Sequence, residues 1–140
     1  MPGIIVGVDG SEHSQLALDW AVQEASLRHA PLTVISVLPA MTSYWGAVPY
    51  VDTGLDIEQV QHEVQMLTDK AVGRLAGPPP TVTVQVTCGS PATELIGAAH
   101  DAGLLVVGSR GSGGFTRLML GSVSSQVAHH APCPVVVVRQ

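Results

Sequence analysis

Short apolar runs alternate along the chain with longer stretches of helical periodicity. The runs are rich in valine and isoleucine, and each is too short for an ordinary helix, which favours β-strands. In the third run, valines at alternate positions are separated by polar residues, as expected for a strand with one covered face and one wetter face. The five predicted strands are Gly3–Val8, Leu32–Leu38, Thr81–Thr87, Leu104–Val107 and Pro134–Arg139.

The first helical stretch follows the first strand almost directly. Ser11 is suited to cap a helix that runs to about Ala30, because its hydroxyl can accept a hydrogen bond from an N–H group of the first turn. Leu16, Trp20 and Leu27 form one apolar stripe of this helix, with alanines at positions 17, 21 and 25 beside it.

Three further helices are predicted. From 55 to 76, apolar residues recur every three or four positions, which is the clearest helical period in the chain, and Gly77 with the prolines behind it ends this helix. Ser90 opens the next helix, because serine is a good cap and the following proline fits the first helical position, and Gly103 ends it. The last helix covers about 122–130.

Residues 39–54 form a long connection for which neither strand nor helix is predicted. The connection contains three turn formers and three aromatic residues, namely Pro39, Gly46, Pro49, Tyr44, Trp45 and Tyr50. Loops of this length in compact domains are often lids or binding loops. The aromatic side chains suit either a ligand or a protein partner.

The alternation of strands and helices predicts an α/β fold, with residues 1–140 as a single domain and helices on both faces of a parallel sheet. Ligands bind such sheets beyond the carboxyl ends of the strands, where the winding direction reverses. Two loops at such ends carry chemistry, Asp9-Gly10-Ser11 after the first strand and 108–122 after the fourth. If these two strands are neighbours, both loops face one crevice and the strand order is 3-2-1-4-5.

The segment 108–122 is rich in glycine and leads from a strand into a helix. Such a turn directs several backbone N–H groups, with their partial positive charge, toward one point, which predicts an anion site for phosphate. Residues 102–140 contain three arginines and no acidic residue, whereas residues 1–101 hold eleven acidic and three basic side chains, a net charge of −8. This asymmetry suits a small polyanion, although chance spacing in a largely buried segment would give the same pattern.

Composition narrows the possible partners. A chain of 140 residues with a net charge of −5 lacks the basic surface of a nucleic-acid binder. No apolar run approaches the roughly 20 residues of a membrane span, and the first residues lack the pattern of a signal peptide. We expect a cytoplasmic protein in which Cys88 and Cys133 are free thiols.

Other chemistries fit the motifs poorly. A Walker loop needs a lysine after its glycines, and the one lysine of the chain, Lys70, lies within a predicted helix. The histidines and cysteines have no zinc-site spacing. No motif brings a nucleophile, a base and an orienting acid together, so neither a catalytic residue nor a protein metal site is predicted.

Three motifs together resemble the universal stress protein family in its ATP-binding branch. They are the opening Gly7-Val-Asp9-Gly-Ser11, the spacing Gly108-x2-Gly111-x9-Gly121-Ser122 and the ending Ala131-Pro-Cys-Pro-Val-Val-Val-Val138. The resemblance covers essentially the whole chain apart from 39–54. It implies a Rossmann-like fold and a stress-response protein that binds ATP, with Mg²⁺ accompanying the triphosphate.

On this resemblance, the nucleoside is held at the first and second strands. Asp9 matches an acidic residue that binds the ribose hydroxyls, a role that suits a carboxylate acceptor. Gly10 and Ser11 flank this contact, and Val37 matches a position whose backbone lies against adenine. Asp9 could instead be only a turn residue, because Asp-Gly pairs favour turns.

The phosphates are expected at the glycine-rich segment. Gly108 and Gly111 would let the main chain approach them, since a Cβ atom there would clash or forbid the required φ angle. N–H groups at the start of the last helix would hold phosphate oxygens. Ser122 could equally be a simple helix cap, and Arg110 a solvated surface charge. The remaining predicted contacts are Ser109, Arg110, Gly121, Ser122 and Val123.

The fifth strand predicts an interface. Val135, Val136, Val137 and Val138 are uniformly apolar, yet the proposed order leaves them at a sheet edge, where an uncovered strand invites pairing. We expect an isologous homodimer in which two such strands meet antiparallel, as the resemblance also implies. Cover by a loop or helix in a monomer is the alternative.

Two classes of function remain from sequence. The first is a nucleotide-dependent regulator that binds ATP without efficient catalysis, and the second is a slow ATP hydrolase, for which no second carboxylate, lysine or glutamine is placed by a motif. AMP or cyclic AMP could replace ATP, because the ribose and adenine contacts do not depend on the number of phosphates in the ligand.

Overall fold

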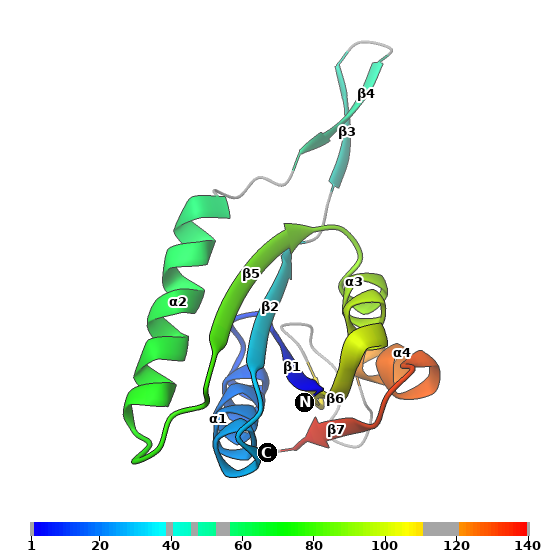
Figure 1. Ribbon diagram of the computed structural model, residues 1–140. Helices are drawn as coiled ribbons and strands as arrows, with labels where there is room; N and C mark the ends of the chain where they lie inside the picture. The colour runs from blue at the N-terminus through cyan, green and yellow to red at the C-terminus, as the bar shows by residue number, and fades with distance from the viewer. Residues whose placement is uncertain (1, 39–40, 46–47, 53–56, 111–120, 140) are drawn as a thin grey trace.

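A parallel sheet of five strands forms the centre of the protein (Figure 1). The computed structural model describes residues 2–38, 41–45, 48–52, 57–110 and 121–139. The strand order β5-β2-β1-β6-β7 confirms the predicted order 3-2-1-4-5. The strands are β1 (Gly3–Val8), β2 (Leu32–Leu38), β5 (Val82–Cys88), β6 (Ala102–Gly108) and β7 (Val135–Val138).

Helices cover both faces of the sheet, as predicted (Figure 1). The helices α1 (Glu12–Arg28) and α2 (Ile57–Gly73) pack on one face, and α3 (Pro91–Ala98) and α4 (Ser122–His130) on the other. Each face of the sheet has its own hydrophobic core. The first core lies under α1 and α2 and contains Val6, and the second lies under α3 and α4 and contains Leu105. Because side chains alternate along a strand, neighbouring residues of β1 and β6 supply the two cores in turn.

Small residues form the inner face of α1. Ala17, Ala21 and Ala25 are fully buried, whereas Leu16 is 37% exposed and Leu27 is 78% exposed. Leu16 and Leu27 therefore lie away from the sheet, whereas Trp20 of the same stripe packs against the core and Leu18 and Val22 are buried with the alanines. The alanines let the helix approach the central strands β1 and β6 closely.

The α3 helix ends earlier than predicted. Gly103 was expected to end it, but α3 ends at Ala98, a short 3₁₀ helix covers Ala99–Asp101, and Gly103 lies within β6. A Cβ atom on Gly103 would lie 2.9 Å from the side chain of Pro2. The close approach of a neighbouring segment accounts for the glycine, which is not a helix stop.

The connection after β2 contains a hairpin, so its prediction as a loop without strands was wrong. Strands β3 (Met41–Trp45) and β4 (Val48–Asp52) pair antiparallel in a second sheet, apart from the main one (Figure 1). Aromatic and β-branched residues on both sides of a short glycine-containing sequence are a hairpin signal. Pro49 obscured it, although proline is tolerated in a strand that has a free edge.

The cysteines and the helix lengths bear on two further features of the chain. Cys88 and Cys133 are free thiols, as expected, and burial raises the pKa of the Cys133 thiol. No helix in the described part of the chain is long and apolar enough to cross a membrane.

Candidate functional site

The turn after β1 holds Asp9 at the carboxyl edge of the sheet. The Ser11 N–H donates to Asp9 Oδ1 at 2.9 Å, and the Asp9 N–H donates to Ser14 Oγ at 3.2 Å. Gly10 has φ +83°, which is strained for a residue with a side chain. Ser11 caps α1 as predicted, because its hydroxyl accepts from the Ser14 N–H at 3.2 Å. These bonds fix the Asp9 backbone while leaving the residue exposed.

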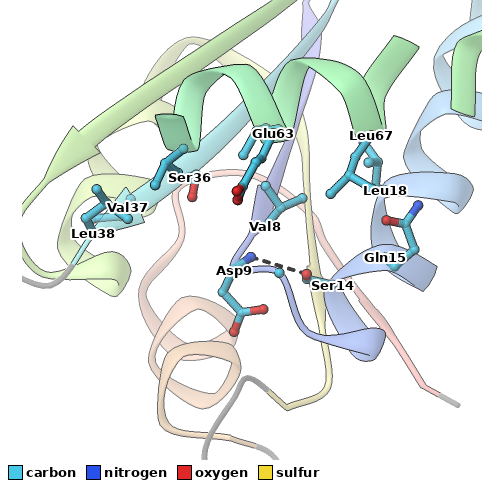
Figure 2. Close-up of a pocket in the computed structure, with 13 residues that line it drawn as sticks. Val8, Asp9, Ser14, Gln15, Leu18, Ser36, Val37, Leu38, Glu63 and Leu67 are labelled. Carbon is cyan, nitrogen blue, oxygen red and sulfur yellow. Dashed lines mark hydrogen bonds between the residues drawn. The ribbon is translucent and has the colours of Figure 1, made fainter. Parts of the chain in front are cut away.

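A pocket of about 280 Å³ opens beside this turn (Figure 2). It lies between the carboxyl ends of β1 and β2 and the helices α1 and α2. Its charged lining residues, among those described, are Asp9 and Glu63, and both are acidic. The lining comprises Val8, Asp9, Gly10, Ser14, Gln15, Leu18, Ser36, Val37, Leu38, Val60, Glu63, Val64 and Leu67.

Val37 and Asp9 meet at this pocket, as the predicted nucleoside contacts require. The Val37 side chain belongs to the core under α3 and α4, where it is 9% exposed. The residue also lines the pocket near the end of β2, so it stands between the second core and the crevice. Predicted contacts from two strands thus share one cavity.

The end of β6 and the start of α4 are bonded to each other. The Gly121 N–H donates to the Ser109 carbonyl at 2.7 Å, and the Ser124 hydroxyl donates to the same carbonyl at 2.9 Å. The Ser109 N–H donates to the carbonyl of Val138, at the end of β7, at 2.9 Å. Gly111 lies outside the described residues. The two ends of the glycine-rich segment are therefore held side by side.

The start of α4 differs slightly from the expectation. Gly121 occupies the cap position with extended backbone angles, and Ser122 is the exposed first residue of the helix. Ser122 is therefore not the cap. The first N–H groups of a helix have no acceptor within it, so those of Ser122 and Val123 are suited to bind an anion.

Gly108 is required by packing against α1. A Cβ atom at this position would lie 2.7 Å from the His13 carbonyl oxygen and 2.8 Å from its carbonyl carbon. Contacts this short with backbone cannot be relieved by moving a side chain. The glycine thus brings the end of β6 against the first turn of α1, a reason that the sequence motif did not provide.

Arg110 lies across the same junction. Its Nη2 atom is 3.2 Å from His13 Nε2, and because a guanidinium can only donate, Nε2 is the acceptor in this contact. His13 Nδ1 is buried and has no hydrogen-bond partner in the described part of the chain. A cationic group is thereby placed between the β1 and β6 turns, where the winding of the sheet reverses.

Sequence reasoning missed several residues of the site. His13, Ser14, Gln15, Ser36 and Glu63 were not predicted, although each lines the pocket or contacts Arg110. Ser36 had a signal, because it is a lone polar residue on the face of β2 that otherwise carries apolar side chains. The helical period of α2 marked its apolar stripe but gave no reason to single out Glu63 beside it.

Comparison with protein families gives a match over nearly the whole chain. The model of the universal stress protein family matches residues 2–139. A universal stress protein of Mycolicibacterium smegmatis is 41% identical over 97% of this chain and 47% of its own length. Universal stress protein YxiE of Bacillus subtilis is 34% identical over 97% of both chains. The chain thus spans about half the length of the first curated relatives it matches and nearly all of YxiE.

Solved structures of similar proteins share the fold. Universal stress protein UspA from Lactobacillus plantarum superposes with a TM-score of 0.84 at 24% identity, over 99% of this chain and 97% of that one. A universal stress protein in complex with cAMP gives 0.68 at 23% identity, over 98% and 96% of the two chains. One from Archaeoglobus fulgidus in complex with dAMP gives 0.65 at 23% identity, over 98% and 97%.

Proposed function

Because the chain belongs to the universal stress protein family, we propose that it binds an adenine nucleotide in the crevice between the β1 and β6 turns. The observation that carries the proposal is the meeting of Asp9 and Val37 at one pocket beside the winding reversal. The structural neighbours with cAMP and dAMP support an adenine ligand. In this proposal Asp9 accepts hydrogen bonds from the ribose hydroxyls, with Gly10 and Ser11 shaping its turn.

The phosphates are assigned to the β6–α4 side of the point where the winding of the sheet reverses. Arg110 is a cation, and the free N–H groups at the start of α4 carry partial positive charge. Two acidic residues line the pocket, so phosphate in the pocket itself would be repelled. The nucleotide therefore lies with its nucleoside over β1 and β2 and its phosphates toward Ser109, Arg110, Gly111, Gly121, Ser122 and Val123.

We propose ATP as the preferred nucleotide, because the β6–α4 side offers more donors than one phosphate needs. Mg²⁺ would be carried mainly by the triphosphate and water, as is usual for nucleotide sites. Within the described residues there is no group of three or more His, Cys, Asp or Glu side chains that could hold a metal ion.

The proposed role is a nucleotide-dependent regulator in the stress response, located in the cytoplasm. A slow ATP hydrolase is the second candidate. It would need a residue that positions water against the γ-phosphate. Glu63 is the one further carboxylate of the pocket lining, and it lies with Val60 and Val64 on the nucleoside side.

A homodimer through β7 is part of the proposal. β7 lies at an edge of the sheet, and all four of its valines are only partly buried. Antiparallel pairing with a second copy would cover them and satisfy the edge N–H and C=O groups. Gel filtration at micromolar concentration tests this part, and elution at the monomer mass would contradict it.

Calorimetry with AMP, cyclic AMP, ADP and ATP tests the binding proposal. We expect ATP to bind most tightly, with AMP weaker by about tenfold or more because it leaves phosphate donors unused. Absence of binding by all four nucleotides would contradict the proposal, and equal affinities would refute the preference for ATP. Release of phosphate by rigorously purified protein, lost in Asp9→Ala and Gly111→Val variants, would favour the hydrolase instead.

A further inference from the structure

Two polar side chains of the pocket have neither a role in the proposed ribose or phosphate contacts nor a hydrogen bond of their own, whereas Ser14 and Gln15 are both bonded within α1 and its cap. Ser36 on β2 is only 4% exposed, yet it lines the cavity, and Glu63 on α2 lines it from the opposite wall. In the described part of the chain neither side chain has a hydrogen-bond partner, and Ser36 Oγ is not one of its fully buried polar atoms, so both groups are open to a ligand in the cavity. Figure 2 shows both oxygen-bearing ends directed toward the part of the pocket that Asp9 borders.

The surroundings of this pair are apolar. Val8, Val60 and Val64 line the same cavity, and Val64 is 7% exposed. Ligand sites typically combine such apolar walls with a few polar groups that fix orientation. A flat, largely apolar ring with polar edge atoms fits this lining, whereas a phosphate does not, because Glu63 would repel it.

The hydrogen-bonding groups of Ser36 and Glu63 distinguish one purine base from another. A carboxylate only accepts hydrogen bonds, and a serine hydroxyl can donate one. Adenine presents an amino donor at C6 beside an acceptor ring nitrogen, which matches an acceptor beside a donor. Hypoxanthine carries a carbonyl acceptor at C6 instead, and a carbonyl facing Glu63 would leave two acceptors opposed.

We propose that Ser36 and Glu63 determine the base specificity of the site, with Glu63 accepting from the exocyclic amino group and Ser36 donating to a ring nitrogen. This inference rests on the proposed adenine-nucleotide function and extends it to residues on β2 and α2. The base would lie against β2 while Asp9 holds the ribose next to it. No part of the contact involves the glycine-rich segment.

The test compares ATP with ITP, which differs by an oxygen in place of the amino group. Titration calorimetry on the full chain measures both affinities for the wild type, Glu63→Gln and Ser36→Ala. We expect the wild type to prefer ATP by about tenfold or more, because a site built for an amino group leaves a polar atom unpaired with the analogue. A carboxamide can rotate to donate, so Glu63→Gln should reduce the preference to about twofold or less.

The variants are chosen so that folding does not obscure the result. Glu63 is exposed, and the Ser36 hydroxyl has no partner in the described residues, so both variants should melt as the wild type does without nucleotide. Asp69→Asn removes the same charge from α2 outside the pocket lining and should keep the wild-type ratio. Ser36→Ala should weaken ATP about threefold to tenfold.

Each outcome bears on the inference. An ATP-to-ITP ratio near one in the wild type, or a ratio unchanged in Glu63→Gln, overturns it even when ATP binds tightly. A ratio that falls equally in Asp69→Asn assigns the effect to net charge and also overturns it. If the wild type binds neither nucleotide, the proposed function fails first, and that result is distinct because no ratio is measured.

Discussion

The two sides of the crevice are built from different chemical groups. On the β1–β2 side, the candidate contacts are mainly side chains, namely the carboxylates of Asp9 and Glu63 and the hydroxyl of Ser36, with the backbone of Val37 beside them. On the β6–α4 side they are mainly backbone N–H groups at a helix start, with one guanidinium from Arg110. Side-chain contacts can be removed one at a time, whereas backbone contacts depend on how the chain is packed. Substitutions should therefore act differently on the two sides.

Gly108→Ala should have the largest effect, and it breaks the backbone side through packing. The added Cβ would lie 2.7 Å from the His13 carbonyl oxygen, so α1 or β6 must shift. We expect the free energy of unfolding, measured in urea, to fall by roughly 2–3 kcal/mol. Gly97→Ala is the matched control, because nothing lies within 4 Å of its Cβ and alanine favours a helix. Equal stability of the two variants would refute the role given to this contact.

Asp9→Asn breaks the side-chain side without disturbing its fold. The amide oxygen can still accept from the Ser11 N–H, so thermal stability should stay close to that of the wild type. Affinity for ATP and AMP should fall alike, by about tenfold to a hundredfold, because hydrogen bonds from the ribose lose a charged acceptor. Calorimetry measures this, with Asp101→Asn at the amino end of β6 as control. A loss confined to ATP would place Asp9 at the phosphates.

Arg110→Gln sharpens the comparison, because it removes the one described cation of the β6–α4 side. ATP affinity should fall about tenfold. AMP affinity should change less, because AMP has fewer phosphate charges that interact with the guanidinium. The salt dependence of ATP binding should also weaken. Arg74→Gln, exposed beyond the end of α2, should change neither quantity. Identical losses for AMP and ATP would contradict the assignment of phosphates to this side.

Ser124→Ala should have the smallest effect. Its buried hydroxyl donates to the Ser109 carbonyl at 2.9 Å, but the Gly121 N–H still donates to that carbonyl in the variant. We expect a loss of about 1 kcal/mol in the free energy of unfolding and a small loss of ATP affinity. Ser125→Ala, on the next position of α4, is the control. A stability equal to that of the control would show that the hydroxyl does not hold the two ends together.

The sequence pattern predicted the sheet because, in the strands, the spacing of apolar residues matches the positions that are buried. The β5 valines alternate and the β6 run is buried throughout, so pattern and position coincided. In α1 they diverged, because contact with the central strands selected alanines over the exposed Leu27. The β3–β4 hairpin was not predicted because Pro49, a common turn former, interrupts the strand pattern of β4.

Some residues of the candidate site could be predicted from the sequence, and others could not. Asp9 and Gly121 could be found because they stand in motifs of fixed spacing. Glu63 and His13 could not, because their place depends on how α2 and α1 pack beside the strand ends, which no local pattern states. Ser36 lay between these cases, as an unexplained polar residue in a buried strand.

The bond from the Ser109 N–H to the Val138 carbonyl ties the end of β6 to the last strand of the sheet. Chains emerge from the ribosome with the N-terminal part first. The Asp9 turn is built from β1 and the first turn of α1, which are made first. The phosphate side is complete only after residue 138 has been made and β7 has joined the sheet. If a triphosphate binds as proposed, it would stabilise β7 together with the phosphate side, because ligand binding to the folded state raises the stability of the elements that form the site.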